Sequence, residues 1–251
     1  MLLADAHTHL DFPEFDPDRE QTVDRARAAG VGWWVICGSR HERWDDTERI
    51  ATETGGVAVL GVHPWSAAEL DEATLAPILA DLRARDLRAV GEIGLDTLHG
   101  GWADQRRALR DQLAIARERD VPVVLHCVRA YPELLAILER DGVPGAGGMM
   151  HAWSGPPDQV ERALALDLHV SFGPMVLHDR AKKARASVPL VPDDRLLVET
   201  DCPNMKAPGV SRGEPSHLPR VVDGLAALRG QGPEHVGEVT ARNLSALLGP
   251  G

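Results

Sequence analysis

Cysteine is scarce in this chain of 251 residues, where it occurs only as Cys37, Cys127 and Cys202. An odd and sparse set argues against a disulfide framework and fits a reducing compartment, so we expect free thiols and a cytoplasmic protein. Long apolar runs are also missing, and the first residues show neither a basic region nor a cleavage-site pattern. We therefore expect no membrane-spanning helix and no signal peptide.

Positive charge is in short supply as well. The chain has 27 Lys and Arg residues against 38 Asp and Glu residues, which gives a formal net charge of −11. This balance opposes non-specific adhesion to nucleic acid and to anionic membranes. A nucleic-acid substrate would therefore need local positive charge, from metal ions or a few arginines. No feature of the sequence predicts an obligate protein partner.

The apolar segments predict a parallel sheet. They are near-continuous rather than alternating, which is typical of strands covered on both faces. The first strand begins with the run at 2–6, and the others are expected at 31–37, 57–62, 88–93, 121–126, 147–151, 168–173 and 195–200.

Helix-like stretches alternate with these strands. One starts near Asp16-Pro17 and ends at Gly30, a second covers 102–120, and a third lies near 156–167. Eight strand–helix units in about 250 residues predict an α/β fold, a (β/α)8 TIM barrel that forms a single domain over residues 1–251. A doubly wound open sheet is the alternative, but no Gly-x-Gly-x-x-Gly follows the first strand. The segment at 202–219 is expected to be a long loop after the eighth strand.

Two histidines, His7 and His9, follow the first apolar run. If the strand continues through them, its period of two directs both imidazoles to the same side. Two neutral imidazoles that converge on one point form half of a metal site. A strand end with two ordinary polar residues is the other interpretation.

Further polar residues are expected where the strands of the barrel end. They are His63, Glu92, His126, His151 and the run Glu199-Thr200-Asp201. The fold would gather these side chains around one axis, and they are ligand types for one or two divalent metals. A lone histidine at a strand end is usually a polar rim residue, but a carboxylate such as Glu92 in an apolar strand is costly unless it is paired or metal-bound.

A family resemblance rests on six motifs in a fixed order. They are Asp5-Ala6-His7-Thr8-His9-Leu10-Asp11, Gly61-Val62-His63-Pro64, Gly91-Glu92-Ile93-Gly94-Leu95-Asp96, Pro122 to His126, His151 with Trp153-Ser154-Gly155, and Glu199-Thr200-Asp201-Cys202-Pro203. Over nearly its whole length the chain resembles TatD-type metal-dependent deoxyribonucleases, a branch of the amidohydrolase-like TIM barrels. The resemblance implies one metal ion held by His7, His9 and Asp201, a second held by His126 and His151, and a bridging Glu92.

The chain departs from the family pattern in three places. Asn204-Met205 stand where the family often has Tyr-Leu, and the loop Arg212 to His217 replaces an Arg-Gly-x-x-Asn-x-Pro motif. Val128 replaces an arginine that commonly follows the fifth-strand histidine, and Arg129 comes next. All three departures fall in expected substrate-contact loops, so they leave the ligand set intact and bear on the substrate.

A two-metal site suits phosphodiester hydrolysis, because two Zn, Mg or Mn ions can activate a water and clamp a phosphoryl oxygen. Asp201 and Glu92 are the expected catalytic carboxylates, with Asp201 accepting the proton of the water. The candidate substrate contacts are His63, Arg129 and Arg212 for phosphates, and Trp65 and Trp153 for bases.

Several of these residues have a second interpretation. For Arg129 a surface position at a helix start is favoured over a phosphate contact, whereas Asp96 either orients a ligand or caps a loop. A cysteine nucleophile is disfavoured, because Cys127 and His126 are neighbours and should face opposite ways on a strand. The three cysteines are therefore interpreted as small buried residues that are dispensable for chemistry.

We predict a divalent-metal-dependent deoxyribonuclease of the exonuclease type, acting on DNA ends or single-stranded DNA. Metal-dependent hydrolysis of a small amide, lactone or phosphoester is the alternative, since fold and metals do not fix the substrate. A catalytically weak binding barrel is a third hypothesis, which the complete ligand set opposes.

Overall fold

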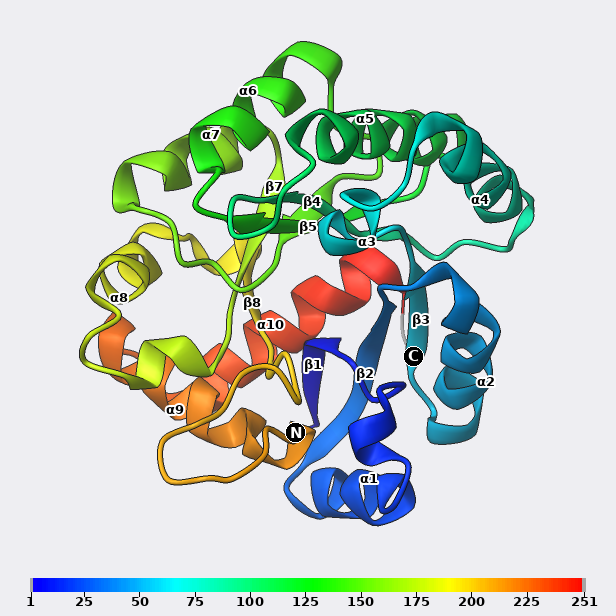
Figure 1. The fold of residues 1–251 in the computed structure, drawn as a ribbon. Helices are drawn as coiled ribbons and strands as arrows, with labels where there is room; N and C mark the ends of the chain where they lie inside the picture. The colour runs from blue at the N-terminus through cyan, green and yellow to red at the C-terminus, as the bar shows by residue number, and fades with distance from the viewer. Residues whose placement is uncertain (1, 250–251) are drawn as a thin grey trace.

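The computed structural model describes residues 2–249. Its eight parallel strands form one sheet in the order of the sequence, wound into a ring with helices outside it (Figure 1). The strands are β1 (Leu3–Thr8), β2 (Val31–Gly38), β3 (Val57–Leu60), β4 (Val90–Asp96), β5 (Val123–Val128), β6 (Gly148–Met150), β7 (Leu168–Phe172) and β8 (Leu196–Val198). The predicted (β/α)8 barrel is confirmed.

The helices fill the connections between the strands. They are α1 (Arg19–Ala28), α2 (Trp44–Thr54), α3 (Pro64–Ala67), α4 (Glu72–Ala84), α5 (Trp102–Arg119), α6 (Tyr131–Asp141), α7 (Val160–Ala165), α8 (Lys182–Ser187), α9 (Leu218–Arg229) and α10 (Pro233–Leu248). Short 3-10 turns occupy Pro13–Phe15, His41–Arg43, Pro157–Gln159, Pro174–Leu177, Val188–Leu190, Asp193–Arg195 and Pro215–His217. Among residues 2–249, no helix combines the length and the apolar character that crossing a membrane requires.

The predicted element bounds differ from the structure mainly where proline intervenes. The first helix begins at Arg19, after a separate 3-10 turn at Pro13–Phe15. The helix expected near 156–167 is likewise split into the turn Pro157–Gln159 and α7. Proline fixes its own φ and lacks an N–H donor, so it favours starting a short turn over continuing a helix. The loop expected at 202–219 ends with the turn Pro215–His217, and α9 begins at Leu218.

Backbone hydrogen bonds between the first and last strands close the ring. The amide of Asp201 donates to the carbonyl oxygen of His7 at 2.9 Å, and the amide of His9 donates to the carbonyl oxygen of Cys202 at 2.8 Å. The buried Asp5 side chain adds to this seam, since it accepts hydrogen bonds from the Thr200 amide at 2.9 Å and from the Thr200 hydroxyl at 2.6 Å. The seam therefore contains residues that the sequence analysis singles out as ligands.

Two apolar cores hold the barrel together. The larger core lies between the strands and the surrounding helices, and the smaller one fills the ring with short side chains such as Ala4, Val59 and Val124. Leu244 and Leu248 of α10 belong to the smaller core. Figure 1 shows α10 crossing the ring, so this helix covers one end of the barrel and the carboxyl ends of the strands are left to form the site.

Candidate metal centre

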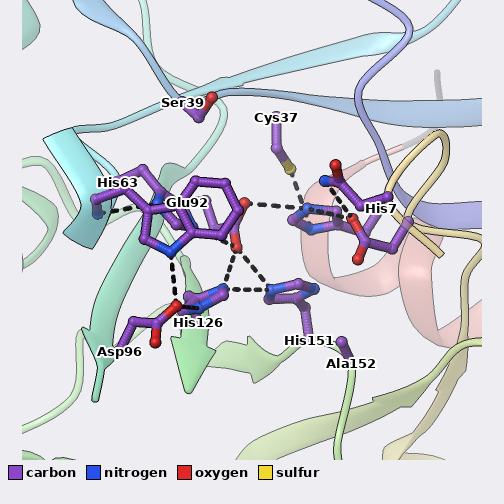
Figure 2. A network of polar contacts seen from close by, with 12 residues as sticks. His7, Cys37, Ser39, His63, Glu92, Asp96, His126, His151 and Ala152 are labelled. Carbon is purple, nitrogen blue, oxygen red and sulfur yellow. Dashed lines mark hydrogen bonds and ion pairs between the residues drawn. The ribbon is translucent and has the colours of Figure 1, made fainter. Parts of the chain in front are cut away.

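The predicted ligands meet at the carboxyl ends of the strands. Glu92 and His126 lie within β4 and β5, His151 directly follows β6, and Asp201 follows β8 after Glu199 and Thr200. All of the predicted ligand side chains are buried. The close-up in Figure 2 shows the side chains of His7, His63, His126 and His151 directed toward Glu92.

Glu92 stands at the centre of this cluster. Its Oε1 atom lies 2.6 Å from Nδ1 of His126, 2.7 Å from Nε2 of His151 and 3.2 Å from Nε2 of His63. Its Oε2 atom faces the other side, 3.3 Å from Nε2 of His7 and 3.6 Å from Nε2 of His9. One carboxylate therefore separates two groups of histidine nitrogens.

Local irregularities of the strands direct His7 and Glu92 into the barrel. The register of β1 against β2 shifts between Asp5 and Thr8, and the register of β4 against β5 shifts between Gly91 and Ile93. Each shift brackets a predicted ligand. Because an irregular position turns the side chains that follow it, such shifts are common beside active sites.

Gly94 lets β4 approach β5 closely at His126. Its φ of +154° is rarely adopted by other residues, and a Cβ atom at this position would overlap the carbonyl oxygen of His126. The Gly-Glu-Ile-Gly motif thus supplies both the central carboxylate and the space for the neighbouring ligand strand.

The first predicted ligand group is brought together as expected. His7, His9 and Asp201 offer ligand atoms within 4.8 Å of one another. Nε2 of His9 lies 3.3 Å from Oδ1 of Asp201 and 3.2 Å from Nε2 of His7. Three converging nitrogen and oxygen donors match the ligand preference of zinc and similar divalent ions.

The second group is larger than predicted. Nδ1 of His126 lies 3.1 Å from Nε2 of His151, and both face Glu92. His63 also falls within this cluster, in a group with Glu92 and His126. However, Nδ1 of His63 accepts a hydrogen bond from the Trp65 amide at 3.2 Å. A neutral His63 ring then carries its proton on Nε2, which makes it a donor toward Glu92 rather than a ligand.

The residues present fit bound divalent cations. Oε2 of Glu92 is buried and has no hydrogen-bond partner among the described residues. A buried carboxylate oxygen without a partner is costly, and a cation between Glu92 and the histidines would satisfy it. Nothing in the donor set favours a thiolate-type site, since only nitrogen and carboxylate oxygen atoms converge there.

The closeness of these histidines and carboxylates also determines which of them are protonated in the absence of metal. Burial pushes the pKa of Glu92 upward, but the positive charge of His151 and the contacts with the other histidines hold that pKa well below its usual range. Burial opposes a charge on His9, yet the hydrogen bond to Asp201 and the charge of Glu92 raise the pKa of His9 to about 9. His151 behaves in the same way, because Glu92 and Glu199 outweigh burial and raise its pKa well above the usual range. The cluster therefore holds protons where a metal would bind.

Two buried carboxylates orient the ligands, and the sequence analysis did not assign them this role. Oε1 of Glu199 accepts a hydrogen bond from the Ala152 amide at 2.6 Å and lies 3.4 Å from Nδ1 of His151. Asp5 accepts a hydrogen bond from the His7 amide at 3.3 Å. Their signal in the sequence was a carboxylate inside an apolar strand, the same feature that singled out Glu92.

Asp96 connects the predicted metal ligands to the rim of the cavity above them. Its Oδ2 atom accepts a hydrogen bond from Nε1 of Trp65 at 2.6 Å and lies 3.3 Å from Nε2 of His126. The other oxygen, Oδ1, accepts a hydrogen bond from the Leu98 amide at 2.8 Å. Asp96 therefore both orients a ligand and caps a loop, so its two predicted interpretations are compatible.

The predicted substrate contacts divide into two sets. Trp65 is 40% exposed and lines a cavity of about 360 Å³ over the metal centre, together with His63. Arg129 is exposed and lines an adjoining cavity. Trp153 is only 1% exposed and packs on Tyr131 at 4.6 Å between ring centroids, so the structure does not support base stacking by Trp153.

Arg212 is not brought to the site. Its guanidinium donates to Asp18 at 2.7 Å and to Glu214 at 2.8 Å, and it lies over the ring of Phe15 at 4.7 Å. It is not among the residues that line the two cavities at the metal centre. The structure therefore uses Arg212 to fasten the altered loop to the start of α1.

The three cysteines are buried and free. Sγ of Cys37 lies 3.3 Å from Nδ1 of His7 (Figure 2), while burial raises the pKa of Cys127 to about 12. Thiols with raised pKa values are poor nucleophiles, which agrees with their interpretation as small buried residues.

Comparison with known proteins identifies the family. The family model described as TatD related DNase matches residues 4–249. A 3'-5' ssDNA/RNA exonuclease TatD from Dickeya dadantii is 35% identical, and the match covers 99% of this chain and 98% of that protein. An uncharacterized metal-dependent hydrolase, YabD, from Bacillus subtilis is 31% identical, and the match covers 98% of this chain and 99% of that protein. The crystal structure of YjjV, a TatD homologue from Escherichia coli, superposes with a TM-score of 0.91 at 31% identity, covering 98% of this chain and 97% of its own.

These matches span essentially the full length of each protein and agree with the ligand cluster in the structure. They confirm the predicted family and the predicted class, a metal-dependent hydrolase of the nuclease type. This chain belongs to the TatD related DNase family.

Proposed function

We propose that this protein is an exonuclease that hydrolyses phosphodiester bonds at the ends of single-stranded or frayed DNA with two divalent metal ions. The observation that carries the proposal is Glu92, whose two carboxylate oxygens each face a separate group of histidine nitrogens. A carboxylate shared in this way is what a pair of ions requires. The exonuclease named in Dickeya dadantii supports the choice of single strands as substrate.

In this proposal His7, His9 and Asp201 hold one ion, His126 and His151 hold the other, and Glu92 lies between them. When bound, Zn, Mg or Mn ions would supply positive charge toward a phosphoryl oxygen and lower the pKa of a water. Burial raises the pKa of Asp201, but its hydrogen bond with His9 and the charge of His7 lower that pKa overall. Asp201 is therefore a carboxylate at neutral pH and serves as proton acceptor for the attacking water.

The remaining contacts position the substrate. His63 lines the cavity over the metal centre, and its one N–H, which faces Glu92 in the absence of metal, is the proposed donor to a phosphate oxygen. Arg129 lies at the adjoining cavity and contacts a neighbouring phosphate. The exposed face of Trp65 at the rim stacks a terminal base.

The shape and charge of the site favour an end over an intact duplex. The ligands lie at the bottom of a cavity of about 360 Å³, which a single strand enters more easily than a double helix. The net charge of −11 gives little long-range attraction for duplex phosphates. We also propose that the chain acts as one domain without an obligate partner, in a reducing compartment such as the cytoplasm, because its three cysteines are unpaired.

The decisive experiment compares end-labelled single-stranded, duplex and nicked DNA with Mg, Mn or Zn, beside a panel of amides, lactones and phosphomonoesters. Stepwise release of mononucleotides that EDTA stops is the expected result. Glu92→Ala should lose metal and at least about 100-fold in turnover, whereas Glu118→Gln, which changes an exposed carboxylate paired with Arg83, should retain both.

Two results would overturn the proposal. A Glu92→Ala protein with normal metal content and normal activity would show that the ligand assignment is wrong. Turnover of a small amide or lactone with no cleavage of any nucleic acid would leave only the general hydrolase hypothesis.

A further inference from the structure

Lysine occurs only three times in this chain, as Lys182, Lys183 and Lys206. Lys182 and Lys183 begin α8, which follows β7, and Lys206 lies in the altered segment after β8. All three therefore belong to connections that follow strands, on the side of the barrel that holds the metal centre. Two of them, Lys183 and Lys206, line cavities beside that centre, whereas Lys182 lines neither.

The larger cavity has a volume of about 630 Å³ and lies between the segments 175–181 and 204–210. It shares Asn204 and Met205 with the cavity over the metal centre, so the two cavities adjoin at these residues. We call this larger cavity, with Arg180 and Lys206 among its lining residues, the lysine groove. A smaller cavity of about 400 Å³, lined by Arg129 and Lys183, also reaches Met205.

The lysine groove is anchored to the metal centre. The amide of Met205 donates to the carbonyl oxygen of Asp201 at 3.0 Å, and Nδ2 of Asn204 donates to Oδ1 of Asp201 at 3.4 Å. Across the groove, Nε2 of His178 lies 3.4 Å from the carbonyl oxygen of Lys206. The position of Lys206 is thus coupled to a proposed ligand and to the opposite wall.

The charged residues that line these two cavities are mostly positive. No carboxylate lines the lysine groove, and the only one that lines the smaller cavity is Asp201. Within residues 2–249, neither Arg180 nor Lys206 forms an ion pair, so both cations are free to meet a ligand at the groove. The one acidic neighbour of Arg180 in sequence, Asp179, pairs with Arg185 at 3.7 Å.

Unpaired cations beside a catalytic cavity indicate a polyanionic ligand. A groove with positive charge and no carboxylate favours a sugar–phosphate backbone, whose phosphates recur at regular intervals. A released mononucleotide is the other anion with suitable charge for this groove, and the experiment below distinguishes the two ligands.

Resting on the proposed nuclease function, we infer that the lysine groove binds the backbone of the single strand beyond the bond being cut. Lys206 and Arg180 contact phosphates of nucleotides that have not yet reached the metal centre. The groove would then set the preference for strand length, while the metal centre performs hydrolysis. This role falls on Lys206, which directly follows the Asn204-Met205 departure from the family pattern.

The test measures kcat/KM for a single-stranded decanucleotide and for a dinucleotide, which carries one internal phosphate and nothing beyond it. The variants are the pair Arg180→Ala with Lys206→Ala, and the control Lys182→Ala, which removes an exposed lysine outside both cavities. The paired variant should lose activity on the decanucleotide and keep its activity on the dinucleotide. Each single-strand phosphate contact contributes about 0.7 to the slope of log affinity against log salt, so this slope should fall by about 1.4. On the decanucleotide, the ratio of kcat/KM of the wild type to that of the paired variant should consequently fall about sevenfold between 50 and 200 mM salt.

The outcomes separate this inference from the function on which it rests. If the wild-type protein cleaves no nucleic acid, the proposed function fails. The groove does not hold the strand if the wild type cleaves both substrates and the paired variant loses the same share of kcat/KM on both. The same conclusion holds if the paired variant loses no activity on either substrate. A variant altered only in inhibition by mononucleotide product would assign the groove to the released anion and would also overturn the inference.

Discussion

Metal binding should release protons, and the amount can be worked out from the cluster around Glu92. A histidine must be neutral to ligate a metal, yet the pKa of His9 is raised to about 9 by its carboxylate partners against the effect of burial. At pH 7, two units below this pKa, only about one molecule in 100 has a neutral His9. The apparent affinity for metal should therefore be about 100-fold below its limit at high pH.

The sign of the pH dependence follows directly. As pH rises from 7 to 8, competition by the His9 proton weakens about tenfold, equivalent to about 1.4 kcal/mol. The raised pKa values of His151 and His126 add further protons, whereas burial and the charge of His151 lower the pKa of His7, which therefore releases none. Affinity should increase by at least about tenfold per pH unit.

Calorimetric titration of the metal-free protein with Mn²⁺ at pH 7 and pH 8, in buffers with different heats of ionisation, measures both quantities. A His235→Gln variant is the matched control, because it removes an exposed histidine paired with Asp193 and should leave proton release unchanged. An affinity that is equal at pH 7 and pH 8, with a binding heat independent of buffer, would refute the idea that carboxylates hold protons on the ligand histidines.

Three further predictions concern stability and substrate contacts. Removing metal with EDTA should lower the melting temperature, since metal at 100 times its Kd adds about 2.7 kcal/mol to the free energy of unfolding, and re-adding Mn²⁺ should restore it; an unchanged melting curve would contradict the ligand cluster. Trp65→Ala should lower kcat/KM for single strands by about 5- to 150-fold, because it removes ~1–3 kcal/mol of stacking. Trp153→Ala should instead lower the free energy of unfolding by about 3–5 kcal/mol and leave KM unchanged. The reverse pattern would place Trp153 at the substrate. Replacing all three cysteines with serine should leave metal-dependent turnover intact in a folded protein, and its loss would revive a role for a thiol.

The barrel and the meeting of the candidate ligands at one site were predictable because they depend on period and position. Apolar runs at regular spacing predict the strands, and a parallel barrel brings the ends of its strands together whatever the loops do. His126, His151 and Asp201 could therefore be placed at one site without knowing any contact. The resemblance to a family then divided them between two ions, which the strand pattern alone could not do.

The roles of residues outside the strands depended on contacts between distant segments. Trp153 follows a ligand-bearing strand, as Trp65 does, but Ala152 before it has a positive φ and the indole packs on Tyr131. Arg212 was expected at the substrate because of its loop, whereas Asp18 and Glu214 bind it at the base of α1. The sequence alone does not show that Trp153 packs on Tyr131 or that Arg212 pairs with Asp18 and Glu214.

The direction in which individual side chains point from the strands was also not predictable from the sequence. A regular strand would alternate its side chains, but the register shifts in β1 and β4 occur at His7 and Glu92 themselves. Sequence periodicity assumes regular pairing, so it cannot show where a strand departs from it. His63 is a related case, because its ring is oriented by the Trp65 amide at the start of α3.

The seam of the barrel sets a condition on when this protein can act during its synthesis. Asp5 and Thr200, which are 195 positions apart, meet across the seam, and the hydrogen bonds beside them join His7 and His9 to Asp201 and Cys202. A chain still growing on the ribosome has its first two histidines long before it has the carboxylate that completes their group. Until β8 and the residues after it have left the exit tunnel and closed the ring, the candidate metal site lacks Asp201. On the proposed function, the growing polypeptide therefore cannot cleave nearby nucleic acid.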